Sequence, residues 1–148
     1  MGSDSLLYEI ECIQIFDEVL SKLGLPGFTI KINNRKVLNG IAEVSGESDR
    51  LTDIVTAIDK LDKIGVEGVV EELNKRDISQ SCIEMIKPLF GLKGTNKERL
   101  GQMSDFLADS EIGMKGLQEL SFLFDIMKHT PIQKGRLEFD VCLARGLN

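Results

Sequence analysis

Two short segments with the alternation of β-strands lie far apart in this chain, and the residues between them have the periodicity of helices. Residues 28–33 (FTIKIN) and 137–142 (LEFDVC) alternate large apolar side chains with polar or smaller ones. Two strands do not form a stable sheet unaided, because further strands or a helical cover are needed. The sequence therefore predicts a helical domain inserted between two strands of a sheet, with the remainder of that sheet outside these 148 residues.

The segment between the strands contains several amphipathic stripes, in which apolar residues recur every three or four positions. The clearest stripe consists of Leu51, Ile54, Val55, Ile58 and Leu61. Thr95 and Glu98 have the spacing of a capping box, which predicts that a further helix begins there. These patterns predict a bundle of helices whose apolar faces meet in a common core.

A helix is also predicted before the first strand. Its predicted inner face consists of Ile10, Ile13, Phe16, Val19, Leu20 and Leu23. Asn33 or Asn34 is predicted to cap the helix that follows the strand, because an asparagine oxygen can accept hydrogen bonds from the first backbone amides of a helix. Asn33, Asn34 and Arg35 are interpreted together as a helix cap and a buried ion pair or dimer contact. A functional role for these polar groups at the strand end stays open as the alternative.

The net charge restricts how this chain could contact a nucleic acid. Its 18 lysines and arginines are outnumbered by 24 aspartates and glutamates, which gives a net charge of −6. This balance argues against broad binding of nucleic acid by bulk charge, so any RNA contact has to be local. Lys93, Lys97 and Arg99 form the local basic cluster, where a phosphate backbone could lie against a turn and a helix start. The alternative is an ordinary solvated helix face.

Several other kinds of site and segment are not predicted. Cys12, Cys82 and Cys142 are odd in number and widely spaced, and His129 is the only histidine, so neither a disulfide framework nor a metal site is expected. No apolar run approaches the roughly 20 residues of a membrane span. The first residues lack the basic flank and apolar stretch of a secretory signal. We expect a soluble protein with no membrane partner.

Three stretches of the sequence closely resemble histidyl-tRNA synthetases. They are residues 28–40 (FTIKINNRKVLNG), 57–65 (AIDKLDKIG) and 143–148 (LARGLN). The last stretch resembles the start of the family's second histidine-recognition signature, which continues in the family with two tyrosines, a threonine and a glycine. Because the stretches follow one another in the family's order, the resemblance covers nearly the whole chain.

The resemblance implies a fold and a division of the chain. The family is a class II synthetase with an antiparallel catalytic sheet and a helical insertion between its second and third class motifs. We therefore expect a mainly α chain: a helical bundle, the insertion domain, flanked by a small α/β remnant of the class II antiparallel catalytic sheet. Residues 1–47 would be a catalytic-core segment of helix, strand and helix, residues 48–134 the insertion domain, and residues 135–148 the return strand of the core.

The resemblance also implies an activity for the longer parent protein. The family activates histidine with ATP and magnesium to histidyl-adenylate and transfers the histidine to tRNA(His). It acts as a homodimer in the cytoplasm, and its insertion domain is expected to contact the acceptor arm of the tRNA. The present segment is not expected to be catalytically competent or to hold a cofactor by itself. The alternatives are a helical protein-interaction module and a regulatory synthetase paralogue without aminoacylation.

Arg145 is the residue to which the resemblance gives a chemical role. It corresponds to the family's catalytic arginine, which binds the histidine substrate and touches the α-phosphate during adenylation. The chemistry is suitable, because a planar guanidinium can hold developing charge on two phosphate oxygens at once. The alternative is a solvated arginine without a role. Asn148 departs from the aspartate that some members carry, so a role that needs a carboxylate there is in doubt.

Overall fold

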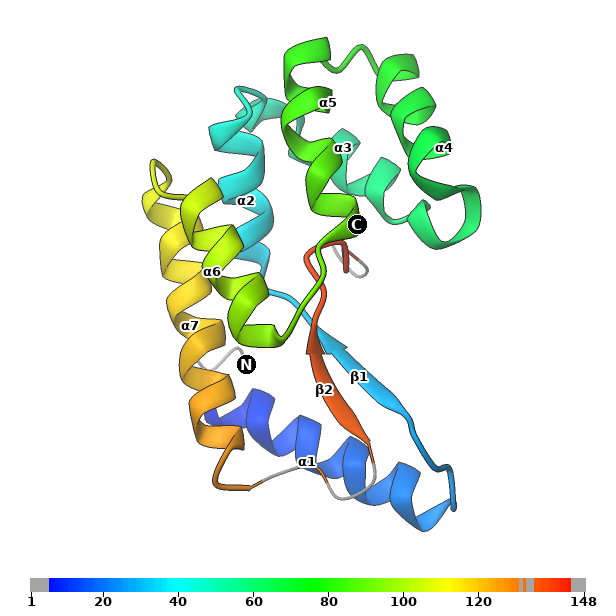
Figure 1. Cartoon of the computed structure of the whole chain (residues 1–148), viewed down its shortest axis with the longest axis vertical. Coiled ribbons are helices and arrows are strands. Elements are labelled where there is room, and N and C mark those ends of the chain that lie inside the picture. Colours follow the sequence, from blue (N-terminus) through cyan, green and yellow to red (C-terminus); the bar gives the residue numbers. More distant parts are fainter. Residues whose placement is uncertain (1–5, 131, 133–134, 145–148) are drawn as a thin grey trace.

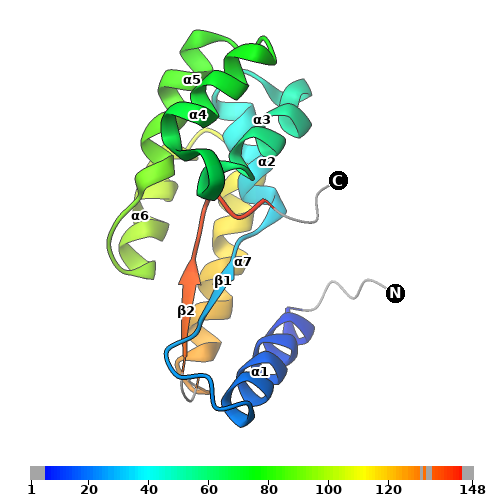
Figure 2. The ribbon, with the colours of Figure 1, turned by 90° about the vertical axis from the view of Figure 1, so that its right-hand side faces the viewer.

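The computed structural model describes residues 6–130, 132 and 135–144 and is mainly helical, with one small sheet (Figure 1). In chain order the elements are α1 (Leu7–Lys22), β1 (Thr29–Ile32), α2 (Arg35–Val44), η1 (Ser48–Arg50), α3 (Leu51–Ile58), α4 (Leu61–Lys75), α5 (Gln80–Ile86), η2 (Lys87–Gly91), α6 (Asn96–Phe106), α7 (Glu111–Met127) and β2 (Arg136–Phe139). Helices α3 to α5 lie at one end of the molecule and α1 at the other, as two perpendicular views show (Figures 1 and 2). The predicted combination of a helical bundle and a small strand remnant is confirmed.

The two strands pair with each other in parallel, with Thr29 opposite Arg136 and Ile32 opposite Phe139. The antiparallel pairing that the family resemblance implied does not describe this pair. A parallel pair needs a long crossover between its strands, and the helical segment from α2 to α7 supplies it. β2 is also shorter than the predicted strand, because the Asp140 carboxylate accepts from the Cys142 amide at 2.9 Å and turns the chain out of the ladder.

α2 lies along α7, and glycines allow the two backbones to approach closely. A β-carbon added at Gly40 would lie 2.6 Å from the Gly113 Cα atom, and one added at Gly116 would lie 2.8 Å from the Val37 backbone nitrogen. Neither distance is compatible with an L side chain. The helix pair therefore depends on having no β-carbon at these positions, and it joins residues on either side of the predicted boundary at residue 47.

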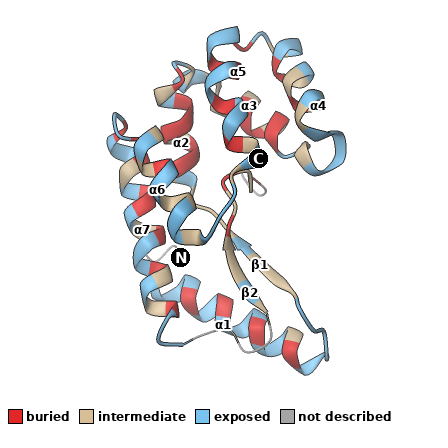
Figure 3. Cartoon of the chain, viewed as in Figure 1, coloured by how far each residue is buried: buried red, intermediate tan, exposed pale blue. Residues whose placement is uncertain are grey.

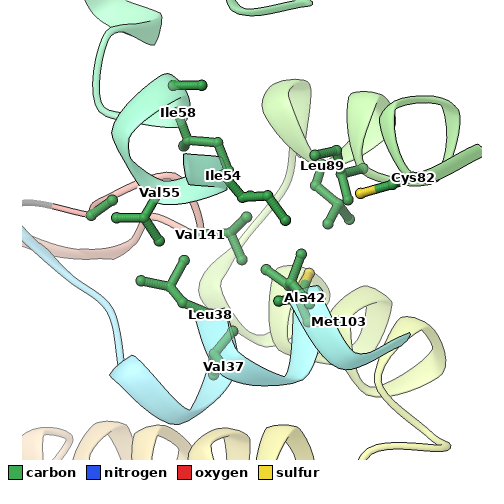
Figure 4. Close-up of a cluster of buried hydrophobic side chains, with 14 of the residues drawn as sticks. Val37, Leu38, Ala42, Ile54, Val55, Ile58, Cys82, Leu89, Met103 and Val141 are labelled. Atoms are coloured by element: carbon green, nitrogen blue, oxygen red, sulfur yellow. The ribbon is translucent and has the colours of Figure 1, made fainter. Parts of the chain in front are cut away.

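One apolar core joins the helices to the second strand. Figure 4 shows side chains from α2, α3, α5, η2 and α6 around a shared interior. Val141, which follows β2, lies in this interior and is 6% exposed, and the Phe139 side chain is fully buried. Because the helical bundle and residues 139–144 share one core, neither packs independently of the other.

α1 presents apolar residues on two sides, and only one side is covered by the described residues. Ile10 and Ile13 pack against Leu123 of α7 in a second, smaller core. Phe16 and Val19 belong to the same predicted face but are 59% and 49% exposed (Figure 3). The predicted inner face of this helix is therefore only half right, because residues 10 and 13 lie on a different side of the helix from residues 16 and 19.

Candidate functional site

The site suggested by the sequence follows β2 along the chain. Arg145 and Asn148 fall outside the described residues. The structure does describe the residues that lead to Arg145, namely 137–144, which we call the return segment. This segment contains most of β2 and the turn after it, and it ends at Ala144, which is 4% exposed. Asn33, Asn96 and Arg99 all donate hydrogen bonds to the backbone of this segment.

Asn33, at the end of β1, holds the turn of the return segment. Its side-chain amide donates to the backbone oxygens of Val141 and Leu143, both at 3.0 Å, while its Oδ1 atom accepts from the Asn34 amide at 2.8 Å. Both amide hydrogens and the oxygen of this side chain are thereby used. Asn33 is thus not the helix cap but the anchor of a segment more than a hundred residues further along the chain.

Asn34 is the residue that caps α2. Its Oδ1 atom accepts from the Lys36 amide at 2.9 Å, and its Nδ2 atom donates to the Glu119 carboxylate of α7 at 2.7 Å. Lys36 pairs with the same carboxylate. The predicted choice between Asn33 and Asn34 as cap is therefore settled in favour of Asn34, and Arg35 is exposed.

Asn96, the first residue of α6, covers the outer edge of β2. Its Nδ2 atom donates to the Leu137 oxygen at 2.8 Å and its Oδ1 atom accepts from the Phe139 amide at 2.9 Å. β1 takes the other edge, where the amides of Arg136 and Asp140 donate to the backbone oxygens of Phe28 and Ile32. A single side-chain amide thus satisfies two of the groups that a third strand would otherwise bond, which covers part of an exposed sheet edge.

Arg99 completes this contact between α6 and β2. Its guanidinium donates to the Phe139 oxygen at 2.9 Å and pairs with Glu138 at 3.2 Å, and its side chain is 20% exposed. Of the three residues predicted to contact tRNA, Lys93 and Lys97 are exposed, whereas Arg99 is directed at the strand. The structure therefore does not bring the three charges together on one open surface.

A cavity of about 300 Å³ lies beside the return segment, and its charged lining is predominantly acidic. The charged residues that line it are Asp59, Asp62, Glu138, Asp140, Lys31 and Arg99. Lys31 bonds Asp140 at 3.2 Å, which raises the pKa of the lysine. With four carboxylates and two cations that are already paired, this cavity disfavours a phosphate group.

Cys142 also lines this cavity, where burial disfavours the thiolate form of its side chain. Burial raises the pKa of its thiol to about 12, so the thiol stays protonated near neutral pH. Among the described residues, no group of three or more His, Cys, Asp or Glu side chains is placed to hold a metal ion. In the same part of the chain, no helix is both long and apolar enough to cross a membrane.

Comparisons with known proteins agree on one enzyme family. No family model matches the chain. The chain is 49% identical over all 148 residues to the histidine--tRNA ligases of Christiangramia forsetii and Flavobacterium johnsoniae, and 47% identical to that of Bacteroides fragilis. It covers 32%, 31% and 32% of these proteins, so it spans about a third of the length of the curated relatives that it matches.

A solved structure from the same enzyme family has a similar fold. The histidyl-tRNA synthetase from Nostoc sp. PCC 7120 superposes with a TM-score of 0.88 at 29% sequence identity. The superposition covers 99% of the present chain and 35% of that protein. The resemblance found in three short stretches is therefore confirmed, and it extends over the whole sequence.

Proposed function

We propose that this chain is a segment of a histidine--tRNA ligase, which activates histidine with ATP and transfers it to tRNA(His). The observation that carries the proposal is the identity of 49%, which extends over all 148 residues rather than over isolated motifs. A free-standing helical interaction module or a regulatory paralogue is not favoured, because the relatives at this level of identity are named as ligases.

Within this proposal the segment supplies two functional parts. Residues 48–134 form the insertion domain, which contacts the acceptor arm of the tRNA, and residues 1–47 and 135–148 belong to the catalytic core. Arg145 binds histidine and the α-phosphate of ATP. The parent acts as a homodimer in the cytoplasm.

ATP and magnesium are assigned to the parent and not to the described residues. The cavity beside the return segment is lined mainly by carboxylates, and no described cluster of acidic side chains is placed to hold a metal ion. These residues do not fit a metal-bound triphosphate. Apart from Arg145, the groups that bind the triphosphate and its magnesium are therefore proposed to lie in the part of the parent that this segment does not span.

The activity of the parent tests the proposal. The full-length protein should catalyse histidine-dependent exchange of pyrophosphate into ATP and should charge tRNA(His), whereas the 148-residue segment alone should do neither. Histidinol, which lacks the carboxylate, serves as the matched control and should support no exchange. A folded full-length protein that shows no exchange would favour the regulatory paralogue instead.

Reversing the charge of Lys93 and Lys97 tests the contact with the acceptor arm. The double change to glutamate should raise the KM for tRNA(His) about fivefold while leaving histidine-dependent pyrophosphate exchange unchanged, because two phosphate contacts are lost. Lys97 lies in the first turn of α6, where a carboxylate is favourable, so the helix should persist.

The matched control for this pair is Lys128→Glu, at the far end of α7, where the lysine side chain is 73% exposed. Its KM for tRNA(His) should stay at the wild-type value. Arg99 is left unchanged because it bonds β2. If the double variant has the same KM as the wild type, these two lysines do not contact the tRNA.

A further inference from the structure

We propose that Asn96 is a positioning residue of the ligase, which fixes the return segment that leads to Arg145 in the sequence. This inference rests on the proposed function, because it assumes that Arg145 acts in adenylate formation. Its own basis is the geometry at the outer edge of β2, where one side chain from the helical insertion bonds two backbone groups of the strand.

The two hydrogen bonds fix the strand along its length. They join Asn96 to the Leu137 oxygen at 2.8 Å and to the Phe139 amide at 2.9 Å, two positions apart on one edge. A contact at a single point would allow the strand to pivot, whereas two bonds define both its position and its direction. The Phe139 side chain, which is fully buried, prevents rotation of the strand about its own axis.

Asn96 is not needed for the start of its own helix. The Thr95 hydroxyl accepts from the Glu98 amide at 3.2 Å and the Glu98 carboxylate accepts from the Thr95 amide at 2.7 Å, which forms the complete capping box. Asparagine at the first helical position also has a lower helix propensity than alanine. The benefit of asparagine at this position therefore lies in its contact with β2.

Asn33 holds the other end of the same segment. It bonds the oxygens of Val141 and Leu143, so the backbone from Leu137 to Leu143 is fixed by one asparagine from the insertion and one that directly follows β1. Arg145 follows the return segment directly in the sequence. Displacement of about 1 Å at a reacting centre can lower a rate about a hundredfold. The rate of adenylate formation should therefore depend strongly on the position of this backbone.

Single-turnover formation of histidyl-adenylate by the full-length parent tests the inference. The variants are Asn96→Ala, which removes both bonds, and Asn96→Leu, which keeps the side-chain size but cannot form them. The control is Asn74→Ala, at an exposed asparagine of α4. Both Asn96 variants should lower the first-order rate constant at least about tenfold, while the burst amplitude and the KM for tRNA(His) stay unchanged.

The two measured quantities separate positioning from stability. A residue that only stabilises the fold lowers the burst amplitude, because fewer molecules are active, but leaves the rate constant of the active molecules unchanged. An unchanged rate constant in both variants, at whatever amplitude, would overturn the inference. If the wild-type parent forms no histidyl-adenylate, the proposed function fails and this inference fails with it. If the wild type is active and both Asn96 variants have its rate constant, only the inference is refuted.

Discussion

Replacing Gly40 with alanine is expected to lower the free energy of unfolding of the chain by about 2 kcal/mol, although alanine is the better helix former. The added β-carbon would lie 2.6 Å from the Gly113 Cα atom and 3.0 Å from both the Leu107 side chain and the Ser110 hydroxyl. The nearest atom is backbone, so it cannot move aside by a change of rotamer. α2 and α7 would have to separate, and the core between them would loosen.

The matched control is the same change at Gly101, in the middle of α6. No heavy atom lies within 4 Å of a β-carbon added there, so Gly101→Ala should raise stability by about 0.5–1 kcal/mol through helix propensity. Urea unfolding followed by circular dichroism measures both, provided the slope of the transition is unchanged. Equal effects of the two substitutions would contradict the close helix crossing.

Replacing Arg145 with alanine in the full-length parent should lower histidine-dependent pyrophosphate exchange at least about a hundredfold, because the charge that develops on the α-phosphate loses its donor. If Arg145 has the proposed role and no other, the protein should keep its stability. Exchange kinetics give the first quantity and the midpoint of thermal unfolding gives the second.

Arg145→Lys distinguishes the geometry of the guanidinium from its charge. Lysine keeps the positive charge but lacks the planar pair of donors, so this variant should also lose most of the activity if two oxygens are held at once. Near-wild-type exchange in Arg145→Ala would refute the catalytic assignment. Wild-type exchange in Arg145→Lys alone would restrict the role of Arg145 to charge.

The helix starts were largely predictable because their signals are local. Thr95 and Glu98 form the predicted capping box, and Ser79 caps α5 by accepting from the Cys82 amide. Both interactions join residues three positions apart, so sequence spacing alone brings them together. One local boundary was misplaced: Leu61 does not continue the helix that contains Ile58 but begins α4.

The candidate site was only partly predictable. Asn34 as a cap follows from its position before a helix, but the role of Asn33 depends on where the return segment lies. Asn96 carries no signal of its own in the sequence, because its partners Leu137 and Phe139 come about forty residues later and reach it only through the fold. The contact of Arg99 with the strand is unpredictable from the sequence for the same reason, since Glu138 is equally distant along the chain.

The sequence by itself determined the helical stripes, the caps, the two strands and the resemblance to one enzyme family. These depend on residues a few positions apart or on direct comparison of short stretches, so no knowledge of the path of the chain is needed. Tertiary structure alone decided that the strands pair in parallel, that Gly40 meets Gly113, and that Asn96 covers part of the edge of β2. Each of these contacts joins residues that are distant in sequence, and only packing of the shared core brings those residues together.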